Sequence, residues 1–491
     1  MVRRGVVRLL TVLLVVVGAH ATQDNRVDAE TPTPPVIPAL QQWVPGGAEF
    51  TLGPTPRIVY SDGALEATSV RLAQGLRAAT GRVVATTVGG VARTGDIEIV
   101  LGADEWSVPR AESYTATIGV TLVLRAATPA GAQHAAQTAL QLLRQSTSVA
   151  GGTAVDWPTY RERGLLLDLG RKYLSVAFIE AQIRRMAYLK MNFLQLHLSD
   201  YFGFRLQSDV HPEITSPEHY SKHEIRHLIA YAASYNIEVV GDIDFPGHMH
   251  AILAAHPELK AAPIGGVPQD GTIDLTNPRS YDLMRDILEE FLPLFPGKYW
   301  NVGGDEYGPS ASADMLHKFI NWADDIVRAH GKTTRIWNDS MARDGSTVPI
   351  NDGIIVEVWT GGSIPPQLGN GLRPAELIAA GHTIKNSSFH PTYRTSGALA
   401  LVVNVPPVLT YATWDPSMFV TGDRLSPQDN AHNLGANVNV WFDDPTAETE
   451  QQVGAGIGEL LRVMAQKTWG SPELPYEEFV RFGAEYGEPV P

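Results

Sequence analysis

The chain has 491 residues, of which 44% are hydrophobic and 19% charged, so it has enough apolar side chains for a packed core and is not globally disordered. Its formal net charge of −15 disfavours nucleic acid as a partner, because a phosphate backbone is bound by a basic surface. The absence of cysteine excludes disulfides, thiolate metal sites and a cysteine nucleophile.

The first 21 residues have the pattern of a secretory signal peptide. Three arginines within the first eight residues give a positively charged start, and an almost continuous apolar run follows over residues 9–17. Ala19 and Ala21 then supply small side chains at the two positions that signal peptidase reads. Because the apolar run is too short to span a bilayer comfortably, an uncleaved membrane anchor is the less favoured alternative. We therefore expect cleavage after Ala21, a secreted protein, and no membrane span after cleavage.

A proline-rich leader and a small domain are expected next. Residues 22–45 contain five prolines, which favours an extended leader over a helix or strand. Residues 46–157 combine both kinds of apolar periodicity, with helices expected over residues 64–79 and 130–143 and strands over residues 97–101 and 119–124. Candidate catalytic residues do not cluster in this segment. It is therefore interpreted as a small α/β (α+β) accessory domain.

The remaining segment, residues 158–491, has a regular pattern of short apolar runs. Helical stretches lie between several of them, for example over residues 178–189 and 224–235. Eight βα units in about 320 residues indicate a (β/α)8 TIM barrel, and solid apolar runs are typical of parallel strands buried on both faces. A doubly wound open sheet is the alternative fold, but no glycine-rich phosphate loop follows a strand here. The runs expected as strands are 165–169, 193–198, 239–243, 300–303, 334–337, 354–358, 383–384 and 438–440.

Two adjacent carboxylates, Asp305 and Glu306, follow Gly303 and Gly304 at the end of one expected strand. In such barrels the chemistry takes place at the carboxyl ends of the strands, and glycines let a ligand approach the backbone closely. Two neighbouring carboxylates do not easily both ionise in a dry pocket. The pKa of one should therefore be raised, which makes a usable general acid at neutral pH. The structural alternative is an acidic pair that caps the next helix.

Aromatic and polar residues end several other expected strands. Trp337, Trp359 and Trp441 each follow an apolar run, and tryptophan faces stack on the C–H faces of sugar rings. Three tryptophans at three strand ends are hard to explain as core residues alone. Polar residues that would bind hydroxyl groups at the same ends are Arg171, Asp200 and Asp443, although a buried arginine held by an aspartate is the alternative for the first two.

His248 and His250 form an H-x-H pair just after Asp242 and Asp244, which makes this segment the best candidate for metal ligands. A metal-dependent barrel hydrolase would need further ligands at other strand ends, and His197 lies inside its expected strand. The favoured interpretation is that His248 forms hydrogen bonds inside the pocket while His250 packs elsewhere. We therefore expect neither a metal nor a cofactor.

Five ordered motifs along the barrel segment point to a known family. They are residues 163–168 with Arg171, residues 189–192, residues 197–200, residues 242–248 and residues 303–306. In residue type and spacing they are similar to the motifs of glycoside hydrolase family 20, the β-N-acetylhexosaminidases. The resemblance extends from about residue 163 to residue 470, and residues 36–157 look like the small domain that usually precedes this barrel.

The resemblance implies a retaining exo-β-N-acetylhexosaminidase that uses no enzyme nucleophile. The substrate's own 2-acetamido carbonyl would attack the anomeric carbon and give an oxazolinium ion. Glu306 would protonate the leaving oxygen and then activate water, while Asp305 would accept the acetamide N–H. The substrates would be terminal, non-reducing GlcNAc or GalNAc residues of oligosaccharides or glycoconjugates.

The resemblance also implies roles for the residues around this pair. Tyr393 would donate a hydrogen bond to the acetamide oxygen, and Trp337 and Trp359 would enclose the acetamide methyl group. Arg171 would bind the O3/O4 side of the sugar, with Asp200 and His248 supporting the pocket. Trp441 would stack beneath the ring, and Asp443 would hold the outer hydroxyls.

Four positions depart from the family pattern: Asn301 replaces a common His, Phe204 a Trp, Thr395 an acidic residue and Asp443 a Glu. The changes at Phe204 and Asp443 fall where the outer sugar is recognised. They leave room for a lacto-N-biosidase of the same family, which releases a disaccharide. A non-catalytic sugar-binding barrel is the alternative from another class, and the intact Asp305–Glu306 pair disfavours it. We favour release of one N-acetylhexosamine, because the rest of the barrel matches the monosaccharide-releasing enzymes.

Overall fold

The computed structural model describes residues 33–307, 311–341, 346–361, 372–420 and 422–487. The expected signal peptide and residues 22–32 of the expected leader lie outside this part of the chain. Among the described residues, no helix has the length and apolar surface that crossing a bilayer requires.

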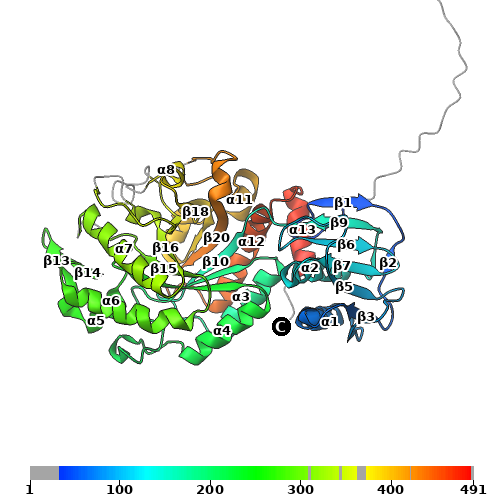
Figure 1. Cartoon of the computed structure of the whole chain (residues 1–491), viewed down its shortest axis with the longest axis horizontal. Helices are drawn as coiled ribbons and strands as arrows, with labels where there is room; N and C mark the ends of the chain where they lie inside the picture. Colours follow the sequence, from blue (N-terminus) through cyan, green and yellow to red (C-terminus); the bar gives the residue numbers. More distant parts are fainter. Residues whose placement is uncertain (1–32, 308–310, 342–345, 362–371, 421, 488–491) are drawn as a thin grey trace, which may run out of the picture. The chain divides into compact units, whose positions relative to one another are not determined.

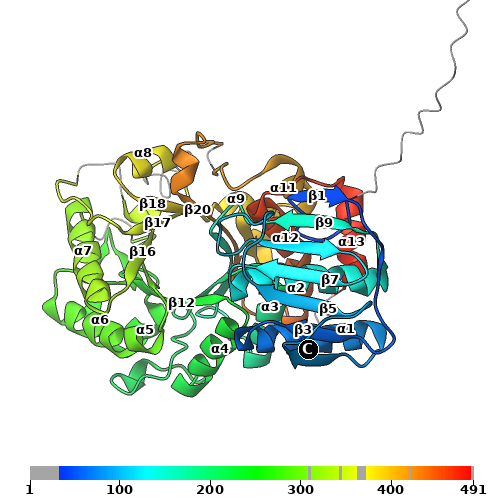
Figure 2. The ribbon, with the colours of Figure 1, turned by 45° about the vertical axis from the view of Figure 1, so that its right-hand side comes forward.

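The small domain is a mixed seven-stranded sheet with two helices packed against it. Figure 2 shows the strands stacked from β1 to β3, and the full order is β1-β9-β6-β7-β5-β3-β4. The helices contact each other, and Gly75 brings them close, because a Cβ there would lie 2.9 Å from the Leu140 side chain. The elements are β1 (Gln42–Pro45), β3 (Arg57–Tyr60), α1 (Glu66–Thr80), β4 (Ala85–Val88), β5 (Ile97–Leu101), β6 (Tyr114–Ile118), β7 (Leu122–Ala126), α2 (Pro129–Gln145) and β9 (Gly152–Asp156), with the short pair β2 (Phe50–Thr51) and β8 (Ser148–Val149).

The expected elements of this domain form, with two differences. Strand β7 begins at Leu122, three residues after the start that the apolar pattern predicts. The end of the expected leader is part of the fold: Val36, Ile37 and Leu40 are buried, and β1 pairs antiparallel with β9. Because β1 is an edge strand, Pro45 at its end removes no hydrogen bond that an inner strand would need.

The second domain is the expected (β/α)8 barrel, and all eight runs predicted as strands form it (Figure 1). The strands are parallel in chain order, and pairing of β10 with β20 closes the ring. Their inward and outward faces are both covered, which explains the solid apolar runs. The strands are β10 (Glu162–Asp168), β11 (Phe193–His197), β12 (Glu238–Phe245), β15 (Tyr299–Gly303), β16 (Thr333–Trp337), β17 (Ile355–Val358), β18 (Thr383–Asn386) and β20 (Asn433–Trp441).

Helices connect these strands, and two of the expected ones form close to their predicted bounds, α3 (Val176–Tyr188) and α4 (Lys222–Ser234). Helix α4 begins with a capping box in which Ser221 and Glu224 bind each other's backbone N–H groups. The other helices are α5 (His250–Ala255), α6 (Pro278–Phe291), α7 (Ala313–Ala329), α8 (Pro374–Ala379), α9 (Phe389–Thr392), α10 (Ala400–Val403), α11 (Pro407–Thr413), α12 (Glu450–Trp469) and α13 (Tyr476–Tyr486), and the hairpin β13 (Lys260–Ile264)–β14 (Val267–Ile273) follows α5.

The connection between β18 and β20 is irregular and contains an additional short strand, β19 (Tyr393–Thr395). It pairs with the end of β20, so that Thr395 lies opposite Trp441. The sequence pattern did not predict this strand, which has only three residues. Its pairing brings Tyr393 to the carboxyl end of the barrel.

Buried polar contacts join the small domain to the barrel. The ammonium group of Lys190 is fully buried and lies 2.9 Å from Asp156 Oδ2, while Trp469 Nε1 donates to Asp156 Oδ1 at 2.7 Å. Arg163 is likewise buried and paired with Glu112. Arg163 and Lys190, which belong to two of the motifs that resemble family 20, therefore hold the two domains together.

Candidate active site

A pocket of about 250 Å³ opens at the carboxyl ends of the barrel strands. Nine of the ten residues predicted for the site line it, and the tenth, Trp337, is buried behind it in a cluster with Trp359 and Trp441. A larger cavity of about 600 Å³ lies at the opposite end of the barrel, around the starts of β10 and β20. The lining of the first pocket is Arg171, His197, Asp200, Asp244, His248, Asp305, Glu306, Trp359, Phe389, Tyr393, Thr395, Leu399, Val403, Trp441 and Asp443.

A tight turn after β15 places the two adjacent carboxylates in this pocket. Gly303 and Gly304 have φ of +77° and +92°, and a Cβ on Gly303 would lie 1.6 Å from Asp244 Oδ1. Glu306 also has a positive φ, +48°, and its N–H donates to Asp339 Oδ2 at 2.9 Å. The glycines are therefore needed for both conformation and space, as the sequence suggested. The pair belongs to the pocket and does not cap the next described helix, α7, whose N-cap is Ser312.

Asp305 lies among further buried carboxyl groups. Burial and then the charge of Asp305 raise the pKa of Asp244 well above its ordinary value. The protonated form of Asp244 is therefore favoured beside the charge of Asp305. Burial raises the pKa of Asp305 as well. Asp339, half-buried and close to Asp305, has its pKa raised to about 7 by the loss of hydration and by the charge of Asp305.

His248 is the counter-charge to this cluster. Its Nε2 lies 3.3 Å from Glu306 Oε2 and 3.5 Å from Asp305 Oδ2, and its Nδ1 lies 3.3 Å from Asp200 Oδ1. Although burial disfavours the imidazolium, Asp200 and Asp305 hold the pKa of His248 well above its ordinary value. The contact with His248 lowers the pKa of Glu306. Of the two adjacent carboxylates, the raised pKa thus belongs to Asp305 in the unliganded site, because the imidazolium stabilises the charge of Glu306.

Arg171 is held by two aspartates at the seam where the barrel closes. Its guanidinium contacts Asp168 Oδ2 at 3.0 Å and Asp200 Oδ2 at 2.9 Å and lies over the Trp441 ring, 5.4 Å from the ring centroid. Asp168 also accepts from the backbone N–H of Phe442 at 3.1 Å, so β10 and the end of β20 share one carboxylate. Arg171 and Asp200 therefore form the ion pair that was considered as the alternative, and both also line the pocket.

Three aromatic rings form the apolar wall. The rings of Trp359 and Tyr393 are nearly parallel, with centroids 6.4 Å apart and an interplanar angle of 12°. Tyr393 and Trp441 are 5.7 Å apart, and Trp359 Nε1 donates to Asp339 Oδ1 at 2.8 Å. Burial and then the carboxylates of Asp305 and Glu306 raise the pKa of Tyr393 well above its ordinary value. The phenol is therefore a neutral hydrogen-bond donor that faces the carboxylate pair.

His250, the second member of the H-x-H pair, does not join His248. Its ring packs against Tyr201, with centroids 4.2 Å apart, whereas His248 forms its contacts inside the pocket. The two side chains therefore do not make a joint metal site.

Several residues of the pocket were not selected from the sequence. His197 contacts Asp200 and Asp242 at 3.1 Å each and lies edge-on to Trp441. Its position inside a strand argued against a role. Asp244 and Asp339 do end strands, so that signal was present. Phe389, Leu399 and Val403 come from the irregular connection between β18 and β20. Its apolar residues have no regular spacing from which their place in the pocket could be predicted.

Comparisons with known proteins identify the family of both domains. The profile of the glycosyl hydrolase family 20 catalytic domain matches residues 160–457, and that of glycosyl hydrolase family 20 domain 2 matches residues 33–157. The chain is 28% identical over 460 residues to a lacto-N-biosidase of Bifidobacterium bifidum, which covers 89% of this chain but only 40% of that protein. It is 27% identical over 414 residues to beta-hexosaminidase subunit A2 of Dictyostelium discoideum, with coverage of 77% and 72%.

Solved structures resemble the whole described chain. A mutant Streptomyces plicatus beta-hexosaminidase in complex with the product GlcNAc superimposes with a TM-score of 0.77, at 26% identity, over 93% of this chain and 95% of that one. The β-N-acetylhexosaminidase of Streptomyces coelicolor gives the same TM-score at 27% identity, over 93% and 96%.

Proposed function

The chain belongs to glycosyl hydrolase family 20, and on that premise we propose that it is a β-N-acetylhexosaminidase that releases one N-acetylhexosamine from the non-reducing end of β-glycosides. The observation that carries the proposal is the Asp305–Glu306 pair at the end of β15, in a pocket walled by Trp359, Tyr393 and Trp441. An aromatic wall binds a sugar ring, and the pair supplies the charge and the proton that cleavage needs.

Asp305 would stabilise the developing charge in a substrate-assisted reaction. Its carboxylate accepts the acetamide N–H, while the acetamide carbonyl oxygen attacks the anomeric carbon and the bond to the leaving oxygen breaks. Positive charge on the resulting oxazolinium ion is greatest in and after the transition state. A carboxylate fixed beside it therefore raises the rate as well as the affinity. Neutral Asp244 and cationic His248 hold that carboxylate in place.

Glu306 would protonate the leaving oxygen and then remove a proton from the water that opens the oxazolinium ring. In the unliganded site His248 lowers the pKa of Glu306, which favours the carboxylate. A sugar in the pocket displaces water, and loss of hydration disfavours a charged carboxylate. Binding of the substrate thereby raises the pKa of Glu306 toward the value that a general acid needs.

The remaining pocket residues would orient the sugar. Tyr393, as a neutral phenol, donates to the acetamide oxygen, and Trp359, backed by the buried Trp337, encloses the acetamide methyl group. Trp441 stacks beneath the ring, and Arg171 and Asp443 bind hydroxyls at the non-reducing end. The substrates are N-acetylhexosamine-containing oligosaccharides or glycoconjugates. Because these would be met outside the cell, the signal peptide fits the same proposal, and sequencing the N-terminus of the exported chain would show a start at residue 22.

Release of lacto-N-biose is the second candidate. Two observations favour it: the similarity to the Bifidobacterium bifidum lacto-N-biosidase extends over 89% of this chain, and Thr395 and Asp443, both shorter than the residues common in the family, line the pocket. Shorter side chains leave space for a second sugar at the non-reducing end.

A substrate panel decides between these candidates. The 4-nitrophenyl β-glycosides of GlcNAc, GalNAc and lacto-N-biose are each incubated with the purified chain and, as a background control, with its Glu306→Gln variant. We expect nitrophenol from one or both monosaccharide substrates. Release only from the lacto-N-bioside would favour the second candidate, and no release from any substrate would favour a non-catalytic sugar-binding barrel.

A further inference from the structure

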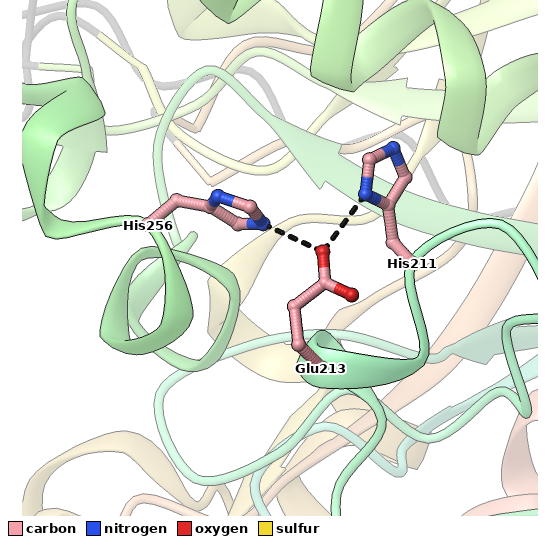
Figure 3. Close-up of side chains that lie close together, drawn as sticks. All are labelled: His211, Glu213 and His256. Carbon is pink, nitrogen blue, oxygen red and sulfur yellow. Dashed lines mark hydrogen bonds and ion pairs between the residues drawn. The ribbon is translucent and has the colours of Figure 1, made fainter.

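A cluster of His211, Glu213 and His256 lies outside the sugar pocket (Figure 3). His211 and Glu213 belong to the connection between β11 and α4, where Glu213 lies in the 3-10 turn Pro212–Ile214. His256 follows α5 in the connection after β12. The lining of the pocket includes none of the three. The cluster therefore joins two loops that also carry Asp200 and His248, respectively.

Both imidazole rings direct a nitrogen at the same carboxylate oxygen. His211 Nδ1 lies 2.9 Å and His256 Nε2 lies 3.0 Å from Glu213 Oε1. The rings are almost perpendicular, with an interplanar angle of 85° and centroids 5.9 Å apart. Ligands of a tetrahedral zinc ion with bonds of about 2.0–2.1 Å lie about 3.4 Å apart, so each nitrogen needs to move only about 0.4–0.5 Å away from Glu213 Oε1 to admit an ion. All three ligand atoms lie within 4.8 Å of one another.

The outer nitrogen of each ring also faces a carboxylate. His211 Nε2 lies 3.2 Å from Asp286 Oδ2 on α6, and His256 Nδ1 lies 3.7 Å from Glu258 Oε1. This arrangement is typical of histidines that bind metals, because the outer carboxylate fixes the tautomer and the direction of the ring. An ordinary surface pair such as His227 with Glu180 has a single carboxylate contact in the described structure.

The charge around the cluster is also suited to a cation. Three carboxylates, of Glu213, Glu258 and Asp286, surround the two rings, and Arg279, 3.3 Å from Glu258, supplies one positive charge. With neutral imidazoles the group carries a net charge of −2, which a divalent ion would neutralise. The histidine side chains are 19% exposed and that of Glu213 is 44% exposed, so an ion has access from solvent.

We propose that His211, Glu213 and His256 bind one divalent transition-metal ion, with zinc the best match and water as the fourth ligand. Two imidazoles and one carboxylate suit zinc, whereas magnesium and calcium prefer oxygen ligands alone. The ion ties the connection after β11 to the connection after β12. It stabilises the two loops that position Asp200 and His248 and takes no part in hydrolysis.

The test measures metal binding to the purified chain after treatment with a chelator and dialysis. Zinc is titrated by calorimetry, and cobalt(II) is followed by the visible absorption of a tetrahedral site. We expect one zinc ion per chain, no binding of magnesium, and a thermal unfolding midpoint raised by about 2–5 °C in saturating zinc. Because the readout is binding, it is independent of whether the proposed hydrolysis is correct.

Variants with matched controls locate the ion. We expect His211→Gln and His256→Gln to weaken zinc binding at least about tenfold and to lose the zinc-dependent rise in unfolding temperature. Removal of an outer carboxylate by Asp286→Asn should weaken zinc binding about 10–100-fold. His227→Gln and Asp282→Asn, the latter one turn away on α6, should bind zinc as the unmodified chain does.

Other results would overturn the proposal. The pocket also contains the groups Asp168–His197–Asp200 and Asp244–His248–Asp305, which offer potential metal ligands. If Asp305→Asn abolished zinc binding while His211→Gln retained it, the ion would belong to the pocket. Equal losses in His227→Gln and His256→Gln, or no binding of micromolar zinc by the unmodified chain, would make the cluster a set of surface ion pairs.

Discussion

Asp244 and Asp305 should respond in opposite ways to the same chemical change, Asp→Asn. Asp244 is 1% exposed, its Oδ1 accepts from Gly304 N at 3.1 Å, and its pKa is raised well above the ordinary value by burial and by Asp305. The raised pKa favours the protonated, neutral form of Asp244. Asparagine keeps the acceptor oxygen for Gly304 and offers an N–H to Asp305, so it imitates the protonated acid.

The expected magnitudes follow from these contacts. Asp244→Asn exchanges one neutral hydrogen-bond donor for another, and we expect kcat/KM to fall by less than about tenfold, or about 1.4 kcal/mol of transition-state stabilisation. In the proposed reaction, Asp305→Asn removes a charge that faces the reacting acetamide group. Loss of one preorganised electrostatic contact typically costs about 10²–10³-fold, or about 2.7–4 kcal/mol.

The assay is the initial rate on 4-nitrophenyl N-acetyl-β-glucosaminide over a range of concentrations, with thermal unfolding of each variant to show that both remain folded. If Asp244→Asn lost as much activity as Asp305→Asn, Asp244 would be ionised in the working enzyme, and the assignment of the proton to Asp244 would be wrong. Near-normal turnover by Asp305→Asn would refute the substrate-assisted reaction.

Three further predictions concern the acid, its counter-charge and the outer end of the pocket. Glu306→Gln should lower turnover of an unactivated GlcNAc disaccharide by about 10²–10⁴-fold and turnover of the nitrophenyl substrate by less, and equal losses would argue against Glu306 as the acid. His248→Gln removes the imidazolium whose contact lowers the pKa of Glu306 and whose positive charge opposes the raised pKa of Asp305. Both limbs of the pH profile of kcat/KM should therefore move to higher pH, and an unmoved profile would show that His248 does not set these pKa values. Asp443→Ala should raise KM and lower kcat on the monosaccharide substrate, whereas an effect confined to the lacto-N-bioside would place Asp443 at a second sugar.

The barrel and most of the pocket could be predicted from the sequence because they depend on strand periodicity. A parallel strand buried on both faces needs an unbroken apolar run, and its carboxyl end must lie at the catalytic edge. The sequence alone was therefore enough to place four residues in one pocket: Asp305, Glu306, Arg171 and Trp441. Their catalytic roles remain predictions.

Features that depend on contacts between distant segments could not be predicted in this way. Which of two adjacent carboxylates has the raised pKa depends on His248, which comes from another strand. Strand β19 forms because it pairs with the end of β20. A strand of three residues is too short for an alternation of apolar and polar side chains to be recognised in the sequence. His211 and His256 lie far apart in the sequence, and only the packing of two loops brings them to one carboxylate.

The seam between the first and last barrel strands has a consequence for folding. Asp168 holds Arg171 beside it and the N–H of Phe442 across 274 residues of sequence, so the part of the pocket around Arg171 forms only after β20 has docked. Pairings this distant in the chain form slowly, because closing a long loop costs entropy before any contact is gained. Appearance of sugar affinity during refolding should thus coincide with closure of the ring, the last step. A bound sugar, in turn, stabilises the closed ring and should slow proteolysis that begins by opening this seam.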